Sequence, residues 1–365
     1  MKSRVASETR KKGSSIYTLA TELNLNPGTI SRALRNRPEV KPETRALVQK
    51  RADELGFKLK RFRPRAINIC ALVQTDSAQA SLFSSYTDAV MDGLWRYCMQ
   101  NDLELSLYSA PLARLNAGFL VRQLAHRGAH GAVVINASDA SRYFRLFHKE
   151  QFPFCAILDG PEEARPWLLS VDNTQLAKRA VEYLIGLGHR RIAMLCGSSE
   201  FATFRSRLEG YRQALKENGI NEDPGLVLFA EKRPPLHGDD FGFGAAGAAE
   251  LLRHHDPPTA MVVMSDESAV GALHGLQRQG KSVPKDISLL CFDDARLARY
   301  ITPTLTVVNI PNTELGFEAG AVVHQRILKK EFSLGGMATT AVRDADLIIR
   351  DSCGPPKRNI LPAAG

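Results

Sequence analysis

The chain has 365 residues, of which 44% are hydrophobic, and a formal net charge of +9. This length exceeds what one compact core usually serves, so two or three domains are expected. No apolar run reaches the roughly 20 residues of a membrane span, and the basic N-terminus lacks the apolar segment of a secretory signal. The six cysteines lie far apart without a C-x-x-C pair, which disfavours a disulfide framework or a zinc site. We therefore expect a cytoplasmic protein with no membrane partner, metal or cofactor.

Positive charge is concentrated at the start of the chain. Residues 1–66 contain 17 Lys and Arg against 6 Asp and Glu, a surplus of 11, so residues 67–365 carry a net charge of −2 within the total of +9. This asymmetry favours a polyanion-binding head on an ordinary globular body. Residues 1–15 have no hydrophobic period and predict a disordered basic extension.

Residues 16–57 have the pattern of three short helices. The apolar residues of "IYTLATEL" (16–23) share one helical stripe. Asn24 in the following turn tolerates a left-handed backbone, Asn26 is a good N-cap, and Pro27 suits the first position of the second helix. A third helix is expected to begin at Pro42. Its inward residues are expected to be Leu47, Val48, Ala52 and Leu55.

Helix, short turn, helix and a supporting third helix predict a helix-turn-helix head that binds DNA. In such heads the N-terminal residues of the second helix face the major groove. The hydroxyls of Thr29 and Ser31 can hold phosphates, and Arg32 can bind a guanine edge with two hydrogen bonds. Pro27 and Gly28 are small residues at the point of closest approach. A protein-docking module is the alternative that this pattern leaves open.

The head resembles that of the LacI/GalR (lactose-repressor) family of bacterial transcriptional regulators. The shared landmarks are T-I-S-R (29–32), V-x-x-x-T (40–44) and E-L-G-F (54–57). The resemblance implies that Pro27, Gly28 and Arg32 read operator bases, and that phosphates are held by Asn26, Thr29 and Ser31.

Beyond residue 66, short apolar runs alternate with helix-length amphipathic segments such as 86–99, 174–186 and 204–218. This rhythm predicts parallel sheets covered by helices on both faces, divided between two lobes. The expected strands are 67–73, 103–108, 131–136, 154–159, 191–197, 226–230, 259–265 and 287–293. The predicted fold class is therefore α/β, with a small all-α head and a two-lobed body of parallel sheets.

Polar groups follow several of these strands, and ligands bind at the carboxyl ends of parallel strands. Ser265 and Asp266 end one run, Asp293 ends another, and the loop after 191–197 leads to Arg207. An arginine and an acid that converge there could bind a hydroxylated ligand through paired hydrogen bonds. Spacing alone leaves open the alternative that Asp266 and Asp294 cap the following helices and Arg207 lies on a solvated face.

The body also resembles the LacI/GalR family. The landmarks V-D-N (171–173), L-G-H-R-R-I-A (187–193), R-L-E-G-Y (207–211), V-P-K-D-I-S (283–288) and F-D-D (292–294) come in the family's order. The resemblance implies the fold of periplasmic sugar-binding proteins, with a ligand between two lobes joined by three crossings. It places Arg207 and Asp293 at ligand-binding positions, Ser265 where the family usually has an Asn, and near the ligand Ser84, Ser85 and Tyr86.

The connection 58–66 departs from the family's hinge segment. It is shorter and strongly basic, and we expect an extended arm in which Arg61 and Arg63 contact the DNA backbone. Two alternatives remain: Leu59 or Phe62 wedges between bases, or the segment is a plain flexible linker.

Two further motifs could suggest other functions. Gly242, Gly244 and Gly247 spell G-x-G-x-x-G, but the segment before them is polar and broken by proline rather than a strand. Close helix packing is the better interpretation of these glycines. His254 and His255 lie at an expected helix end without a partner cluster, so no metal site is predicted.

The sequence thus predicts a ligand-responsive transcriptional regulator, a repressor rather than an enzyme. It would bind near-palindromic double-stranded operator DNA as a homodimer, with a small sugar-like effector between the lobes. A stand-alone sugar-binding receptor without a DNA function is the alternative, and an activator role or a purine effector remains open within the main interpretation. The expected domains are an extension (1–15), the head (16–57), a hinge (58–66), the effector-binding and dimerisation body (67–350) and a tail (351–365). The tail has no heptad repeat, so no coiled coil is expected to join two dimers.

Overall fold

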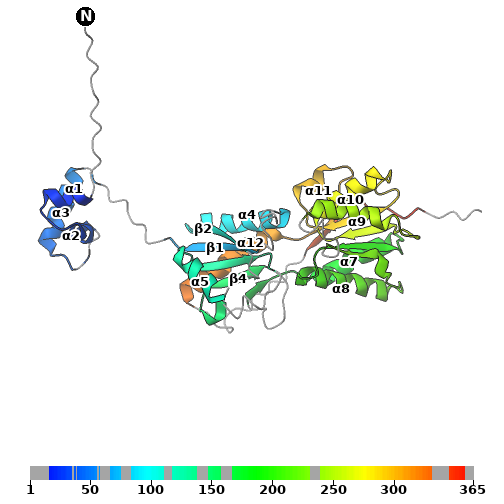
Figure 1. The fold of residues 1–365 in the computed structure, drawn as a ribbon, viewed down its shortest axis with the longest axis horizontal. Helices are drawn as coiled ribbons and strands as arrows, with labels where there is room; N and C mark the ends of the chain where they lie inside the picture. The colour runs from blue at the N-terminus through cyan, green and yellow to red at the C-terminus, as the bar shows by residue number, and fades with distance from the viewer. Residues whose placement is uncertain are drawn as a thin grey trace, which may run out of the picture. The chain divides into compact units, whose positions relative to one another are not determined.

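The computed structural model describes most of the chain (Figure 1). The described residues are 16–34, 37, 39–55, 57, 66–74, 84–110, 117–137, 147–157, 167–230, 239–330 and 345–357. They belong to two compact units, one ending at Ala66 and one beginning at Ile67. The extension 1–15 and the predicted arm residues Arg61 and Arg63, with Leu59 and Phe62, lie outside the described residues. Among the helices that are described, none is long and apolar enough to cross a membrane.

The first unit is a three-helix head. Its helices are α1 (Ile16–Glu22), α2 (Pro27–Leu34) and α3 (Pro42–Glu54). Leu19, Ile30 and Val48, one from each helix, are fully buried and form the centre of the core. Asn24, in the turn between α1 and α2, has a φ of 51°, as expected for a turn residue that tolerates the left-handed region.

One prediction for the head is wrong. Leu47 was expected to face inward, but 52% of its surface is exposed. Val48 and Ala52 of α3 are buried four residues apart, so they define the inward stripe of the helix. Leu47 lies one residue before this stripe and is therefore rotated out of it.

The first lobe of the body is a five-stranded parallel sheet with the order β2-β1-β3-β4-β5. Its strands are β1 (Asn68–Gln74), β2 (Glu104–Ala110), β3 (Gly131–Ile135), β4 (Phe154–Ile157) and β5 (Leu168–Leu169). Alternate strand residues face opposite sides, and they pack into two separate apolar clusters. One face is covered by α4 (Ser85–Gln100) and α12 (Asn312–Lys329), and the other by α5 (Ala117–His126).

The second lobe is a six-stranded sheet with the order β11-β10-β9-β8-β6-β7, in which only β11 runs antiparallel. Its strands are β6 (Ile192–Cys196), β7 (Val227–Phe229), β8 (Ala260–Val263), β9 (Ser288–Phe292), β10 (Thr306–Asn309) and β11 (Asp346–Ile348). A 3-10 turn, η3 (Pro224–Leu226), precedes β7. Helices cover both faces (Figure 1). They are α7 (Asn173–Gly186) and α8 (Ala202–Glu217) on one face, and on the other α9 (Asp240–Leu251), α10 (Asp266–Arg278) and α11 (Arg296–Tyr300).

The order of the elements makes the chain pass between the lobes three times. It leaves the first lobe after β5, returns from β10 to α12, and leaves again between α12 and β11. The α/β fold class with a helical head and a two-lobed parallel body is thus confirmed. All eight expected strands are present, whereas the short strands β5, β10 and β11 were not predicted.

Of the G-x-G-x-x-G glycines, Gly244 serves close helix packing as predicted, whereas Gly247 faces the Leu195 side chain of β6. A Cβ atom on Gly244 would lie 1.9 Å from the backbone oxygen of Ser268, and one on Gly271 would lie 2.0 Å from that of Phe241. Helices α9 and α10 therefore touch backbone to backbone, which residues with side chains would prevent.

Candidate functional site

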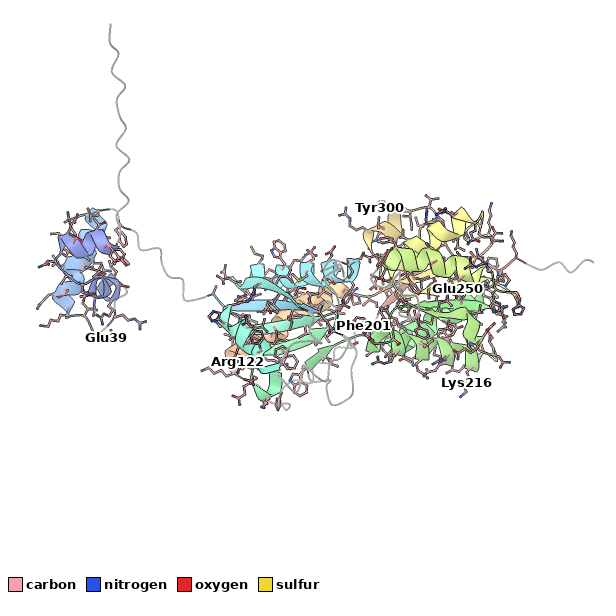
Figure 2. All side chains as sticks on the ribbon, in the orientation of Figure 1. Glu39, Arg122, Phe201, Lys216, Glu250 and Tyr300 are labelled. Carbon is pink, nitrogen blue, oxygen red and sulfur yellow. The ribbon has the colours of Figure 1, made fainter. Side chains whose placement is uncertain are left out.

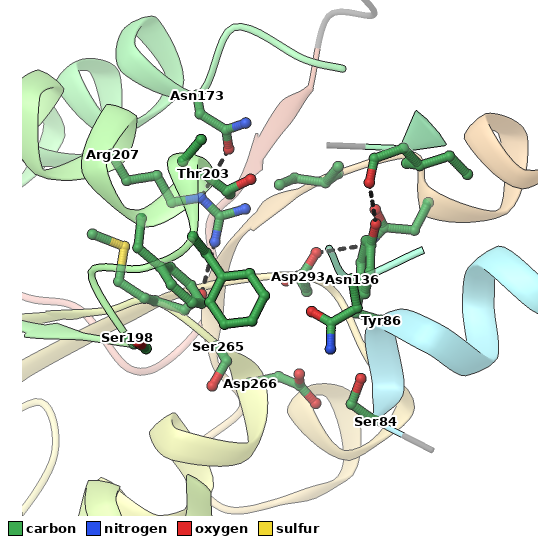
Figure 3. Close-up of a pocket in the computed structure, with 18 of the residues that line it drawn as sticks. Ser84, Tyr86, Asn136, Asn173, Ser198, Thr203, Arg207, Ser265, Asp266 and Asp293 are labelled. Atoms are coloured by element: carbon green, nitrogen blue, oxygen red, sulfur yellow. Dashed lines mark hydrogen bonds between the residues drawn. The ribbon is translucent and has the colours of Figure 1, made fainter. Parts of the chain in front are cut away.

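A cavity of about 300 Å³ lies at the carboxyl ends of strands from both lobes. Its lining includes Asn136 after β3 and Ile157 at the end of β4 in the first lobe. From the second lobe it includes Met264 after β8, Asp293 after β9 and Ile310 after β10. This is the position in which open α/β sheets bind ligands. The cavity is therefore the candidate ligand site of the body (Figure 3).

Arg207 on α8 is buried in the wall of this cavity, with 4% of its surface exposed. Its Nε donates a hydrogen bond to Oδ1 of Asn173 at 2.9 Å, and its Nη1 donates to the backbone oxygen of Met264 at 2.7 Å. The guanidinium also lies 4.0 Å from the ring centroid of Phe292, within cation–π range. These contacts hold the planar donor group in one orientation before any ligand arrives, which lowers the entropic cost of binding.

Asn173 can reach Arg207 because α7 and α8 pack closely. A Cβ atom on Gly210 of α8 would lie 2.0 Å from the backbone oxygen of Thr174 on α7. Only glycine permits this approach. Asn173 belongs to the V-D-N landmark, but its contact with Arg207 depends on tertiary packing and was not predicted.

Asp293 follows β9 and has a left-handed backbone, with a φ of 71°. This conformation is uncommon for a residue with a side chain and is often found at functional sites. Its Oδ1 accepts a hydrogen bond from Nδ2 of Asn312 at 2.7 Å. Burial raises the pKa of Asp293, while Arg207 and the Asn312 hydrogen bond act in the opposite direction. Arg207 and Asp293, predicted from the strand ends and the resemblance, thus both line the same cavity.

Ser265 and Asp266 both line the cavity, but they do so differently. Ser265 is the N-cap of α10: its Oγ accepts a hydrogen bond from the backbone N of Ser268 at 3.2 Å and donates one to the Ser268 Oγ at 3.0 Å. The alternative that Asp266 caps this helix is therefore wrong, since Asp266 is the first helical residue. Burial, helped by the nearby Asp293 and Glu267 carboxyl groups and opposed by a hydrogen bond from Ser85, raises the pKa of Asp266 to about 7.

The start of α4 brings the first lobe to the cavity. Ser84 is the N-cap of α4 and lines the cavity together with Tyr86, whose hydroxyl donates to the backbone oxygen of Ile157 at 3.0 Å. Ser85 does not line the cavity; its backbone N donates to Oε1 of Glu267 in the second lobe at 3.4 Å. Of the three residues predicted to lie near the ligand, Ser84 and Tyr86 thus line the cavity, whereas Ser85 contacts the opposite lobe.

Phe201 and Phe204 add an aromatic wall that sequence analysis missed. Their rings meet edge to face with centroids 5.9 Å apart, and both line the cavity. Figure 2 shows Phe201 where the two lobes meet. Flat apolar surfaces suit the face of a sugar ring or a nucleobase. The only sequence signal was the F-A-T-F stretch before Arg207, which by itself is indistinguishable from ordinary core residues.

In the head, the residues predicted to contact DNA lie at the start of α2. Asn26, Gly28 and Arg32 are exposed, while Pro27, Thr29 and Ser31 are half-buried. The Oδ1 of Asn26 accepts a hydrogen bond from the Gly28 N at 2.8 Å, and the Arg32 Nε donates to the Gly28 oxygen at 3.2 Å. Because its oxygen is engaged, the group that Asn26 can offer to a phosphate is its NH₂. The first turns of α1 and α2, both described, contain no acidic residue that would repel DNA.

His254 and His255 lie in the turns after α9, with ring centroids 4.5 Å apart. The described residues contain no group of three or more His, Cys, Asp or Glu that could hold a metal ion.

The chain is similar to known proteins along most of its length. Residues 181–353 match the periplasmic binding protein-like domain family. The chain is 27% identical to the HTH-type transcriptional repressor CytR of Escherichia coli (strain K12), covering 92% of this chain and 94% of that protein. A structure of the lac repressor dimer bound to operator and the anti-inducer ONPF has a TM-score of 0.71 at 19% identity, covering 94% of this chain and 100% of that chain. The transcriptional regulator CelR–cellobiose complex has a TM-score of 0.68 at 24% identity, covering 93% and 99%.

A three-helix head, a two-lobed parallel body and a cavity at the strand ends are combined in one chain, and its relatives of similar length are transcriptional regulators. Over most of its length the chain is similar to regulators of the LacI/GalR family, the family whose landmarks its sequence carries. Its relatives include the HTH-type transcriptional repressors CytR of Escherichia coli (strain K12) and PurR of Vibrio atlanticus (strain LGP32).

Proposed function

We propose that the protein is a cytoplasmic repressor that binds a near-palindromic operator as a homodimer and responds to a small sugar-like effector. The effector would bind in the cavity between the lobes and shift their relative positions, and with them the two heads. Such coupling requires the effector to bind with unequal affinity to the arrangement of the lobes that favours DNA binding and to the arrangement that does not. The proposal rests above all on the buried pair of Arg207 and Asp293 in that cavity, within a chain that also carries a DNA-binding head.

The chemistry of the cavity supports a hydroxylated effector. Arg207 offers fixed donors, Asp293 offers an acceptor, and the Phe201 and Phe204 rings offer an apolar face. A sugar presents this combination of hydroxyl groups around an apolar ring face. The relative CelR has been solved with cellobiose, which is consistent with this class of ligand.

The head supports direct readout of DNA. Exposed Arg32 can bind a guanine edge, and Asn26, Thr29 and Ser31 offer donors to phosphates at the N-terminus of α2. Pro27 and Gly28 keep the start of the helix small where it would approach the bases. We also propose that Arg61 and Arg63 contribute phosphate contacts.

Exposed apolar side chains on the body support pairing of two copies. Trp95 and Met99 lie one turn apart on α4 and are 52% and 59% exposed. Leu297 and Tyr300 on α11 are 46% and 81% exposed, and α4 and α11 lie on the same side of the body in Figure 1. Apolar residues gathered in this way typically mark an interface. The solved lac repressor is a dimer, and a second copy would complete a two-fold arrangement matched to a palindromic operator.

A combined binding experiment tests this proposal. The preferred DNA site is first selected from a random library with the full chain, and a sugar panel is then screened for stabilisation of the protein against heating. The stabilising sugar should change the affinity for the selected DNA. Arg207→Ala should abolish this response and preserve DNA binding without the sugar, whereas Arg212→Ala, which removes an exposed Arg212–Glu222 ion pair on the same helix, should preserve both. A response that survives Arg207→Ala would remove this cavity from the proposal.

A further inference from the structure

Asp266 has an environment that the function described so far does not explain. Its side chain lies at the start of α10, lines the cavity and is only 3% exposed. The Ser85 side chain donates a hydrogen bond to its carboxyl group, yet Oδ2 is buried and has no hydrogen-bond partner within the described part of the chain. A buried carboxyl oxygen without a partner is costly, so its retention calls for an explanation.

We propose that Asp266 is a specificity-determining residue whose Oδ2 accepts a hydrogen bond from a hydroxyl or amine of the effector, and that it rejects an effector with an anionic group at this point. This inference rests on the proposed function, because it assigns a role within the same cavity. It adds a discrimination against anionic effectors that Arg207 and Asp293 do not supply.

The position of Asp266 favours its role in effector recognition. Asp266 comes from the second lobe and faces the start of α4 in the first lobe, where Figure 3 shows it opposite Ser84. Its contact with Ser85 fixes the carboxyl group at the junction of the lobes. A ligand group that donates a hydrogen bond to Oδ2 therefore adds a contact at the junction of the two lobes. The same hydrogen bond removes the cost of the unpaired oxygen.

The charges around the cavity also favour a neutral or amine-bearing effector over an anionic one. Among the described lining residues, the acidic side chains are Asp240, Asp266, Glu267 and Asp293, and the basic one is Arg207. Burial also raises the pKa of Glu267, with Asp240 and Asp88 acting in the same direction. A phosphate or carboxylate near Asp266 would meet repulsion from several sides. A neutral hydroxyl or a protonated amine would meet a complementary field.

Matched sugar probes test the assignment with the full chain. Glucose, galactose, ribose and cellobiose represent hydroxyl donors, glucosamine and galactosamine represent amine donors, and glucose 6-phosphate and ribose 5-phosphate are anionic counterparts. Thermal shifts identify binders and calorimetry measures their affinities, both at pH 8, where Asp266 is ionised and its carboxylate can accept a hydrogen bond. The parent protein should bind at least one hydroxyl or amine probe and neither phosphate. The affinity for glucose relative to glucosamine, or for galactose relative to galactosamine, then shows whether the effector donates from a hydroxyl or from an amine.

Substitutions at Asp266 then separate this role from a general charge effect. Asp266→Asn, which keeps the size of the side chain, should weaken the bound probe by tenfold or more, and Asp266→Ala should weaken it at least as much. Asp88→Asn removes one negative charge outside the cavity and should change affinity by less than about twofold. Thermal unfolding without ligand verifies that each variant is folded.

Two results would overturn the inference alone, namely preferential binding of a sugar phosphate and undiminished affinity in both folded Asp266 variants. Failure of the proposed function gives a different pattern, in which the parent binds none of the probes, Arg207→Ala leaves affinity unchanged or the protein does not bind DNA at all, and the inference then fails with it.

Discussion

Asn312 in the first lobe holds Asp293 in the second, with its Nδ2 donating to Oδ1 of Asp293 at 2.7 Å. Asn312 is the first residue of α12, which packs against α4 and the sheet of the first lobe. Asp293 follows β9 of the other sheet. A residue proposed to bind the effector is thus oriented by the opposite lobe. The effector and the arrangement of the lobes therefore act on the same hydrogen bond, which offers a direct route for coupling.

Asn312→Ala should weaken effector binding without removing any proposed effector contact. Loss of the donor leaves Asp293 partly unpaired and free to turn, at a cost of about 1–3 kcal/mol, which corresponds to roughly 5-fold to 150-fold in affinity. Calorimetry with the stabilising sugar measures the change. Glu314→Ala, an exposed substitution on the same helix, is the control. Equal affinities for Asn312→Ala and the parent would show that Asp293 is oriented without this bond.

Arg32→Ala should relax the sequence preference of the head. A guanidinium bound to a base edge contributes about 1–3 kcal/mol at one base pair, so the variant should lose affinity for the preferred site and tolerate changes at that pair. Titrations of the parent and the variant on a set of single-base variants of the site measure this. Lys50→Ala removes an exposed charge on α3 and should weaken all sites alike. A uniform loss for Arg32→Ala as well would identify Arg32 as a phosphate contact.

Substitution of the exposed α4 residues should dissociate the dimer. Trp95→Glu places a charge in the apolar patch formed with Met99, where a second copy would have to desolvate it. Sedimentation should then show monomers at concentrations where the parent is a dimer, with weaker DNA binding because both half-sites are no longer joined. Arg96→Ala breaks the exposed Arg96–Asp92 ion pair of α4 and should leave the dimer intact. Deletion of 358–365 should not change the assembly, since the tail lacks a heptad repeat.

The sequence was sufficient to predict those helices and strands that are determined by their own local residue pattern. The Asn26–Pro27 helix start and the longer buried strands follow from capping chemistry and apolar runs, and they were found where expected. The positions of Arg207 and Asp293 required the resemblance as well, because spacing alone allowed a solvated arginine. The structure was needed for contacts between distant segments.

Asn173 beside Arg207 and Asn312 beside Asp293 are such contacts, since each joins elements that are separate in the sequence. The packing of α7 on α8 through Gly210, and the return of the chain from β10 to α12, bring these side chains together. Nor could the sequence distinguish Ser84, which lines the cavity, from Ser85, which contacts Glu267. One residue along the start of a helix changes the direction of the side chain by about 100°.

Asp266 should make the stability of the body depend on pH. Its pKa is raised from an ordinary 3.8 to about 7, chiefly by burial, so between these values the folded state holds a proton that the unfolded chain has released. Stability from this group is therefore greatest below about pH 4, falls as the pH rises toward 7 and is constant above it. The full difference is on the order of 4 kcal/mol. Asp266→Asn cannot ionise, so its melting temperature by calorimetry should exceed that of the parent more at pH 8 than at pH 5. The carboxyl groups that face Asp266 are those of Asp293 and Glu267, and both remain in the Asp266→Asn variant. A difference between variant and parent that does not change from pH 5 to pH 8 would show that Asp266 titrates normally and that its environment is less buried than the structure indicates.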